Sequence, residues 1–190
     1  MRRLVIPLLA VALVAVLVIG LTQAGSRSDR PEEAAPEFDL QAAQRELAGS
    51  PPPLAALHAQ ANQLLDGGFD EQLDKLEGRP IVVNKWASWC RPCRAEFPVF
   101  QQVATDRGKE IAFIGVNSAD KRPAAEKFLT ERPLPYPSYE DPNEEIAQDL
   151  KVPKAFPMTV MIAADGKTYI KSGEYTSRAQ LEADIDRYLG

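Results

Sequence analysis

The chain opens on a long apolar run. Residues 4–21 carry no charge and contain one proline, Pro7, and they follow the basic pair Arg2 and Arg3. As an α-helix this run would measure roughly 27 Å, close to the hydrocarbon core of a bilayer at about 30 Å. We therefore expect residues 1–24 to form a cytoplasmic stub and a transmembrane helix, with the rest of the chain outside, because basic residues stay inside. A cleaved signal peptide ending near Ala24 is the alternative, and it exports the same part of the chain.

The next stretch, residues 25–52, is polar and contains several prolines. It begins with the charged run from Arg27 to Glu33 and ends in Ser50 followed by three prolines. Such a segment buries little apolar surface, so we expect a flexible linker, with a short helix over 41–47. The remaining residues, 53–190, have the length of one globular domain.

Within residues 53–190, apolar residues alternate between strand spacing and helical spacing. Strands are predicted at 81–86, 111–117, 159–162 and 167–170, the last two as a hairpin across Asp165 and Gly166. Helices are predicted at 54–65, 69–76, 93–107, 123–131 and 144–150, and after Ser177. A strand–helix–strand unit followed by a hairpin and a helix implies an α/β fold, in which helices flank a central mixed sheet.

Composition and charge narrow the possible functions. The net charge of −5 at pH 7 argues against nucleic acid as a partner. A structural zinc site needs about four ligands, but the chain has two cysteines and one histidine, His58, which we expect at the surface of the first predicted helix. Nothing near His58 in the sequence ties it to a cysteine, as a Cys–His protease would require. We therefore expect no metal and no cofactor.

Both cysteines lie in one motif, Trp89-Cys90-Arg91-Pro92-Cys93, between a predicted strand and a predicted helix. At the helix N-terminus, Cys90 would lie beside unpaired N–H groups and the positive end of the helix dipole, which favour its thiolate. Arg91 should lower the pKa of Cys90 further, within the range of about 3.5–7.5 known for such thiols, and Pro92 removes an amide without a helical partner. Cys93, nearly one turn on, can attack a disulfide formed at Cys90. The motif predicts thiol–disulfide exchange; a purely structural disulfide is the alternative, although so small a loop restricts the unfolded chain little.

The segment 83–98, VNKWASWCRPCRAEFP, and the later Phe156-Pro157-Met158-Thr159 resemble the thioredoxin superfamily, specifically its TlpA/ResA-like, membrane-anchored thiol–disulfide oxidoreductases. The resemblance covers roughly residues 78–190 and implies a thioredoxin-like fold. It implies that Cys90 is the nucleophile and Cys93 the resolving thiol of a redox disulfide, flanked by Trp89. It also implies a cis peptide bond before Pro157, with Phe156 lining the substrate-facing groove.

Several positions depart from the family pattern. Asn84 stands where thioredoxin has a buried aspartate, and a neutral amide cannot take a proton from Cys93. Glu96 is a candidate for that role, with a solvated surface position as the alternative. Lys85 replaces the usual aromatic residue, and we expect its stem along apolar surface with its amine in water. Trp86 is expected in the core, and residues 53–77 are predicted as a helical extension where relatives often have a β-hairpin.

The resemblance implies an exported, membrane-tethered disulfide reductase. Its substrates would be disulfides of extracytoplasmic proteins, as in cytochrome c maturation, and a DsbD/CcdA-like membrane carrier would supply electrons. Arg91 favours instead an oxidase or isomerase, because a stabilised thiolate makes the pair more oxidising. A peroxiredoxin-like peroxidase and a non-enzymatic binding module of the same fold are further alternatives. The segment before Cys90 counts against the peroxidase, and the intact cysteine pair counts against the binding module.

Overall fold

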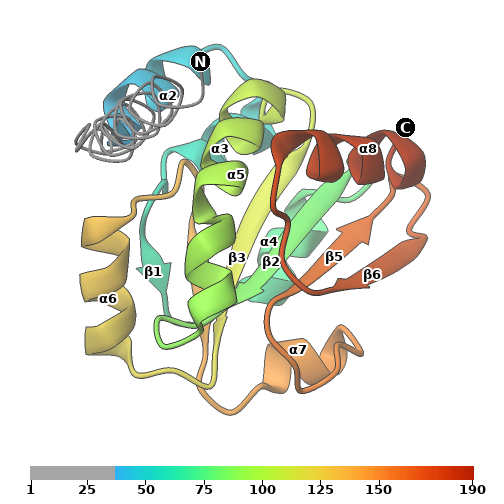
Figure 1. Cartoon of the computed structure of the whole chain (residues 1–190). Coiled ribbons are helices and arrows are strands. Elements are labelled where there is room, and N and C mark those ends of the chain that lie inside the picture. The colour runs from blue at the N-terminus through green and yellow to red at the C-terminus, as the bar shows by residue number, and fades with distance from the viewer. Residues whose placement is uncertain (1–36) are drawn as a thin grey trace, which may run out of the picture. The chain divides into compact units, whose positions relative to one another are not determined.

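The computed structural model describes residues 37–190, and in this part of the chain six strands form one mixed sheet (Figure 1). The strands are β1 (Leu64–Leu65), β2 (Ile81–Trp86), β3 (Ala112–Ser118), β4 (Ser138–Asp141), β5 (Met158–Ile162) and β6 (Thr168–Ser172). Their order is β1-β4-β3-β2-β5-β6. The first four are parallel to one another, while β5 runs antiparallel to β2 and forms a hairpin with β6.

Helices cover both faces of this sheet. They are α2 (Leu40–Glu46), α3 (Pro52–His58), α4 (Phe69–Lys75), α5 (Arg91–Arg107), α6 (Arg122–Glu131), α7 (Glu145–Asp149) and α8 (Arg178–Tyr188). Buried residues of α5, α6 and α8 form one apolar core with one face of the sheet, and those of α3, α4 and α7 form a second core with the other face. The expected α/β fold with a central mixed sheet, a hairpin and a C-terminal helix is confirmed.

Strand β2 lies in the middle of this arrangement and is buried on both faces. Side chains alternate between the two faces of a strand. Val82 and Trp86 accordingly belong to the core under α5, whereas Ile81 and Val83 belong to the core on the opposite face. Trp86 is fully buried, as expected. Every side chain of β2 therefore enters a protein interior, whatever its polarity.

The segment before the sheet is folded from residue 38 onward. Asp39 caps α2 by accepting a hydrogen bond from the Ala42 backbone N–H at 2.9 Å. Ala43 and Leu47 are buried, and Leu47 lies against Gly108 at the end of α5. Residues 38–190 form one compact unit, so the prediction of a flexible linker up to residue 52 is wrong from residue 38 onward. Apolar side chains at helical spacing over 40–47 supply the buried stripe.

The predicted helix over 54–65 is shorter than expected. α3 ends at His58, and Asn62 adopts a left-handed backbone conformation with φ of 62°. Its side-chain oxygen accepts from Leu134 N at 2.9 Å, and its amide nitrogen donates to the Leu129 carbonyl at 3.3 Å. The next residues then pair with β4 as the short strand β1. The prediction failed because adjacent leucines at 64 and 65 fit a helical stripe and a buried strand equally well.

Strand β4 was not predicted, because its sequence is polar. Ser138 and Asp141 are nevertheless buried, and both have hydrogen-bond partners. Trp86 Nε1 donates to Ser138 Oγ at 3.1 Å, and Ser118 Oγ donates to Asp141 Oδ2 at 2.7 Å. These bonds satisfy the polar atoms of β4 inside the sheet.

The expected transmembrane helix or signal peptide, and the first part of the expected linker, lie outside the described residues. Among residues 37–190, none of the helices has the length and apolar character needed to cross a bilayer.

Candidate active site

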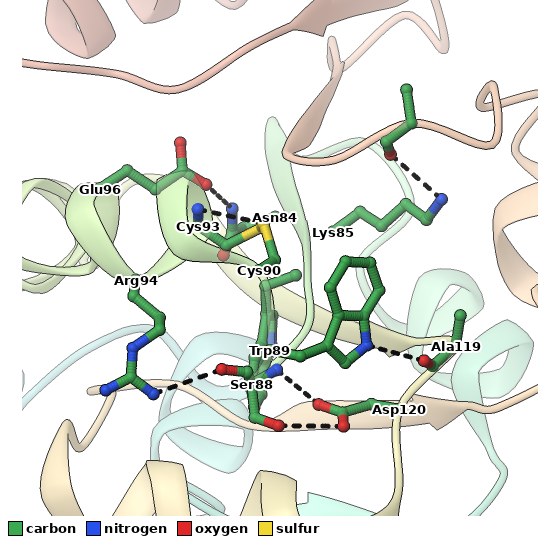
Figure 2. The surroundings of a disulfide bond; sticks show 12 residues. Asn84, Lys85, Ser88, Trp89, Cys90, Cys93, Arg94, Glu96, Ala119 and Asp120 are labelled. Carbon is green, nitrogen blue, oxygen red and sulfur yellow. Dashed lines mark hydrogen bonds between the residues drawn. A yellow bond between two sulfur atoms is a disulfide. The ribbon is translucent and has the colours of Figure 1, made fainter.

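The cysteine motif lies where β2 ends and α5 begins (Figure 2). Cys90 is the N-cap residue of α5, and its Sγ accepts a hydrogen bond from the Cys93 backbone N–H at 3.2 Å. The two cysteines form a disulfide, with their Cα atoms 5.3 Å apart. Arg91, in the first turn, is exposed, and Pro92 is half-buried. Cys90 is 3% exposed and Cys93 is fully buried, so a partner reaches Cys90 first.

A loop that follows β3 fixes the residues just before the disulfide. Asp120 accepts hydrogen bonds from the backbone N–H and, at 3.0 Å, from the hydroxyl of Ser88. It also accepts one from Asn117 Nδ2 at 3.0 Å. Trp89 Nε1 donates to the Ala119 carbonyl at 2.9 Å (Figure 2). Asp120 was missed from the sequence, although β2 and β3 are parallel neighbours, so the residues that follow them lie at the same edge of the sheet.

An aromatic surface lies beside the disulfide. The Phe156–Pro157 peptide bond is cis. The Phe156 ring is half-buried and meets the Trp89 ring edge-to-face, with ring centroids 5.0 Å apart. Trp89 itself is 59% exposed, and the Pro157 carbonyl accepts a hydrogen bond from Gly173 N at 3.1 Å. Residues 67 positions apart in the chain thus form one surface next to Cys90.

Glu96 is fully buried, which overturns the alternative that it is a solvated surface residue. It follows Cys93 by three residues, the spacing that places two side chains on one face of a helix. Its Oε1 accepts from Asn84 Nδ2 at 2.8 Å (Figure 2), and its Oε2 accepts from Tyr175 N at 3.1 Å. Burial raises the pKa of Glu96 to about 8, while the bonds from Tyr175 and Asn84 and the cation of Lys171 act in the opposite direction. A carboxyl group with this pKa can exchange protons near neutral pH.

The expected solvent position of the Lys85 amine is wrong. The side chain is 2% exposed, and its Nζ forms an ion pair with Glu144 Oε1 at 2.7 Å. Nζ also lies 3.4 Å from the carbonyl oxygens of Pro153 and Ala155. Because side chains alternate along β2, Lys85 points to the face opposite Asn84, and α7 and the chain after it cover that face. Glu144, which the sequence analysis did not single out, carries no local motif that would have revealed this pairing.

The chain's histidine lies at the far end of α5 from the disulfide. His58 is half-buried beside Gly108, and burial lowers its pKa. The expected surface position is therefore only partly right. Among residues 37–190, no group of three or more acidic, histidine or cysteine side chains is arranged to hold a metal ion.

Comparisons with known proteins agree with this site. The sequence profile of the Redoxin family matches residues 32–187. The thiol:disulfide interchange protein DsbE of Tatumella citrea is 32% identical over 140 residues, which are 73% of this chain and 69% of that protein. The thiol-disulfide oxidoreductase ResA of Oceanobacillus iheyensis is 32% identical over 99 residues, and the match spans half the length of each chain. The crystal structure of a protein described as thiol:disulfide interchange protein DsbE, from Chlorobium tepidum, shares 30% identity and a TM-score of 0.56, covering 62% of this chain and 85% of that one. The chain therefore belongs to the Redoxin family.

Proposed function

We propose that this protein is an exported thiol–disulfide oxidoreductase that reduces disulfides of extracytoplasmic proteins. The observation that carries the proposal is the Cys90–Cys93 disulfide at the N-terminus of α5, with the exposed Trp89 and the half-buried Phe156 beside it. The names of the DsbE and ResA relatives support exchange chemistry of this kind.

The reaction proceeds in two exchanges. The Cys90 thiolate attacks one sulfur of the substrate disulfide; a mixed disulfide forms, and the other substrate sulfur leaves as a thiolate that takes a proton from solvent. Cys93 then loses its thiol proton and attacks the Cys90 sulfur. The mixed disulfide breaks, the second substrate thiolate leaves and is protonated, and the Cys90–Cys93 disulfide forms. Two electrons pass from the cysteine pair to the substrate.

In this proposal the ionised form of Glu96, a minority of the folded molecules below pH 8, takes the proton that Cys93 loses. It lies on the same face of α5 as Cys93 and is buried, so its carboxylate is a stronger base than a solvated one. Asn84 does not take the proton; its amide nitrogen donates to Glu96 and holds the carboxyl group in place.

The location and the electron donor belong to the same proposal. The apolar run over residues 4–21 supports a single-pass membrane tether with the catalytic domain outside the cytoplasm. Each turnover leaves the protein in its disulfide form, so a reductase needs a source of electrons on that side. A DsbD/CcdA-like membrane thiol carrier meets this need, and apocytochromes c are candidate substrates.

A second direction of exchange, oxidation or isomerisation, is favoured by one observation. Arg91 is an exposed cation in the first turn of α5, next to Cys90. A cation there stabilises the thiolate and so the reduced form, which raises the reduction potential. A potential near −270 mV, about that of thioredoxin, would support the reductase; a value between about −180 and −120 mV would support the oxidase or isomerase.

Insulin reduction tests the exchange activity directly. With dithiothreitol as electron source, the full-length protein should accelerate insulin reduction, and Cys90→Ser should abolish the acceleration. Cys93→Ser should instead trap a mixed disulfide between Cys90 and the substrate, visible on a non-reducing gel. Activity of Cys90→Ser equal to wild type, or no exchange at either thiol of the wild type, would contradict the proposal.

A further inference from the structure

A buried cation lies on the face of β2 opposite the Asn84–Glu96 pair. Lys85 belongs to the middle strand of the sheet, and its side chain is 2% exposed. Burying an ammonium group costs free energy unless charged or polar partners surround it. The groups that surround the Lys85 amine therefore offset this cost, and Lys85 in turn fixes their positions.

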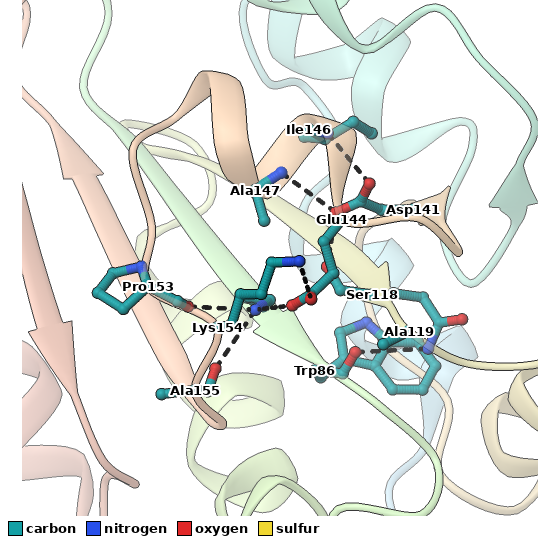
Figure 3. Close-up of polar contacts among 12 residues, drawn as sticks. Trp86, Ser118, Ala119, Asp141, Glu144, Ile146, Ala147, Pro153, Lys154 and Ala155 are labelled. Carbon is teal, nitrogen blue, oxygen red and sulfur yellow. Dashed lines mark hydrogen bonds and ion pairs between the residues drawn. The ribbon is translucent and has the colours of Figure 1, made fainter.

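All of these partners lie on one segment of the chain. The nearest is Glu144, at 2.7 Å, which precedes α7 and adopts a left-handed backbone with φ of 60°. The other oxygen atoms belong to the carbonyls of Pro153 and Ala155. Figure 3 shows Glu144, Pro153 and Ala155 close together, between α7 and the chain that leads to β5.

The last partner is the ring of Phe156, beside the cysteine motif. Lys85 Nζ lies 4.1 Å from the centroid of the Phe156 ring, within the range of a cation–π contact. The same ring meets Trp89 at 5.0 Å between centroids. A continuous set of contacts thus runs from Glu144 through Lys85 and Phe156 to Trp89.

We propose that Lys85 is a positioning residue that determines how the protein binds protein substrates. It holds the segment 153–156 and the Phe156 ring against Trp89, so that the aromatic surface is formed before a substrate arrives. The inference rests on the proposed exchange activity, because it concerns the binding of the disulfide substrate. Lys85 lies on the other face of β2 from Asn84 and Glu96, so its replacement should leave the thiol chemistry intact.

Substrates of different size separate binding at the Trp89–Phe156 surface from exchange at the thiols. A folded protein such as insulin covers the Trp89–Phe156 surface when its disulfide reaches Cys90. Hydroxyethyl disulfide is too small to cover that surface and reports on the thiols alone. Losing a buried cation–π contact should therefore raise the KM for insulin roughly ten-fold, with little change in kcat.

Lys85→Met in the full-length protein tests the inference, because methionine keeps an unbranched apolar stem and removes the charge. We expect a roughly ten-fold higher KM for insulin, an unchanged rate with hydroxyethyl disulfide and an unchanged Cys90–Cys93 potential. Lys109→Met is the matched control: Lys109 is an exposed lysine that follows α5, outside the segment from Glu144 to Phe156, and its removal should leave all three quantities unchanged. Lys85→Arg, which keeps the cation, should have an insulin KM close to that of the wild type.

Each contrary result has a distinct meaning. An insulin KM equal to wild type, or an equal loss with both substrates, would overturn the positioning role. A shifted potential would show that Lys85 acts on the thiols instead. If Lys85→Met does not fold, Glu144→Gln replaces it, since this variant keeps Lys85 but weakens its anchor and should also raise only the insulin KM. Absence of exchange in the wild type would refute the proposed function itself.

Discussion

Replacing Glu96 by glutamine should remove a large part of the pH dependence of the protein's stability. In the folded, oxidised protein the pKa of Glu96 is raised to about 8 by burial, from an ordinary value of 4.5. Below pH 4.5 the carboxyl group is protonated in both the folded and the unfolded chain. Between 4.5 and 8 it ionises only in the unfolded chain, so unfolding becomes more favourable as the pH rises. Above pH 8 both states are ionised, and the contribution to stability is lost.

The size of the effect follows from the two pKa values. They differ by about 3.5, which corresponds to about 5 kcal/mol at about 1.4 kcal/mol for each pH unit. From pH 5.5 to pH 7.5 alone, the wild type should lose between about 2 and 3 kcal/mol relative to Glu96→Gln. With a urea m-value of about 2 kcal/mol/M, the urea midpoint of the wild type falls by about 1 M more than that of the variant.

Urea unfolding of the oxidised full-length protein across this pH range measures the difference. Glutamine has one acceptor oxygen where glutamate has two, so it cannot accept from both Asn84 and Tyr175. The lost hydrogen bond destabilises the variant by about 1–3 kcal/mol. That loss does not change with pH, so it does not affect how strongly the stability of the variant depends on pH. Glu77→Gln, at an exposed position that is not among the causes of the raised pKa of Glu96, is the control and should keep the slope of the wild type. A difference between wild type and Glu96→Gln that stays constant or grows with pH would refute the reasoning.

Two further predictions concern residues that the sequence analysis missed or misplaced. Asp120→Ala should cost about 1–3 kcal/mol in urea unfolding, because Ser88 loses two hydrogen bonds to a carboxylate, and it should slow insulin reduction; the exposed Asp149→Ala is its control, and equal stability of the two variants would contradict the role. Leu47→Ala should cost about 2–5 kcal/mol, because Leu47 is buried within the folded unit, whereas the exposed Glu46→Ala should change little. A Leu47→Ala variant as stable as wild type would show that residues 38–52 behave as the linker that composition predicts.

What the sequence predicted correctly depends on local signals. The cysteine motif, the strands on either side of α5 and the C-terminal hairpin are each specified by residues close together in the chain. Ser177, for example, caps α8 by accepting from Gln180 N three residues later. Such patterns can be recognised without knowing what packs against them.

The errors come from contacts between distant residues. Lys85 and Glu144 are 59 residues apart, so no local pattern announced the buried ion pair, and a lone lysine in a strand was expected to reach water. Glu96 was left open for a similar reason, since Tyr175, which bonds its carboxyl group, is 79 residues away. Leu64 pairs with β4, a polar strand without a period-two pattern. Because nothing near Leu64 in the sequence indicates this partner, its helical spacing led to the prediction of a helix over 54–65.

The alternation of side chains along β2 has a consequence for how such a protein can change. Asn84 and Lys85 are neighbours in the chain, yet Asn84 contacts Glu96 of α5, whereas Lys85 contacts Phe156 and the segment that precedes it. Under the proposed function, substitutions at position 84 should act on the thiol exchange and substitutions at position 85 on substrate binding, with little interference between them. A single strand position would then offer a designer, or natural selection, a route to new partners that leaves the proposed thiol–disulfide exchange unchanged.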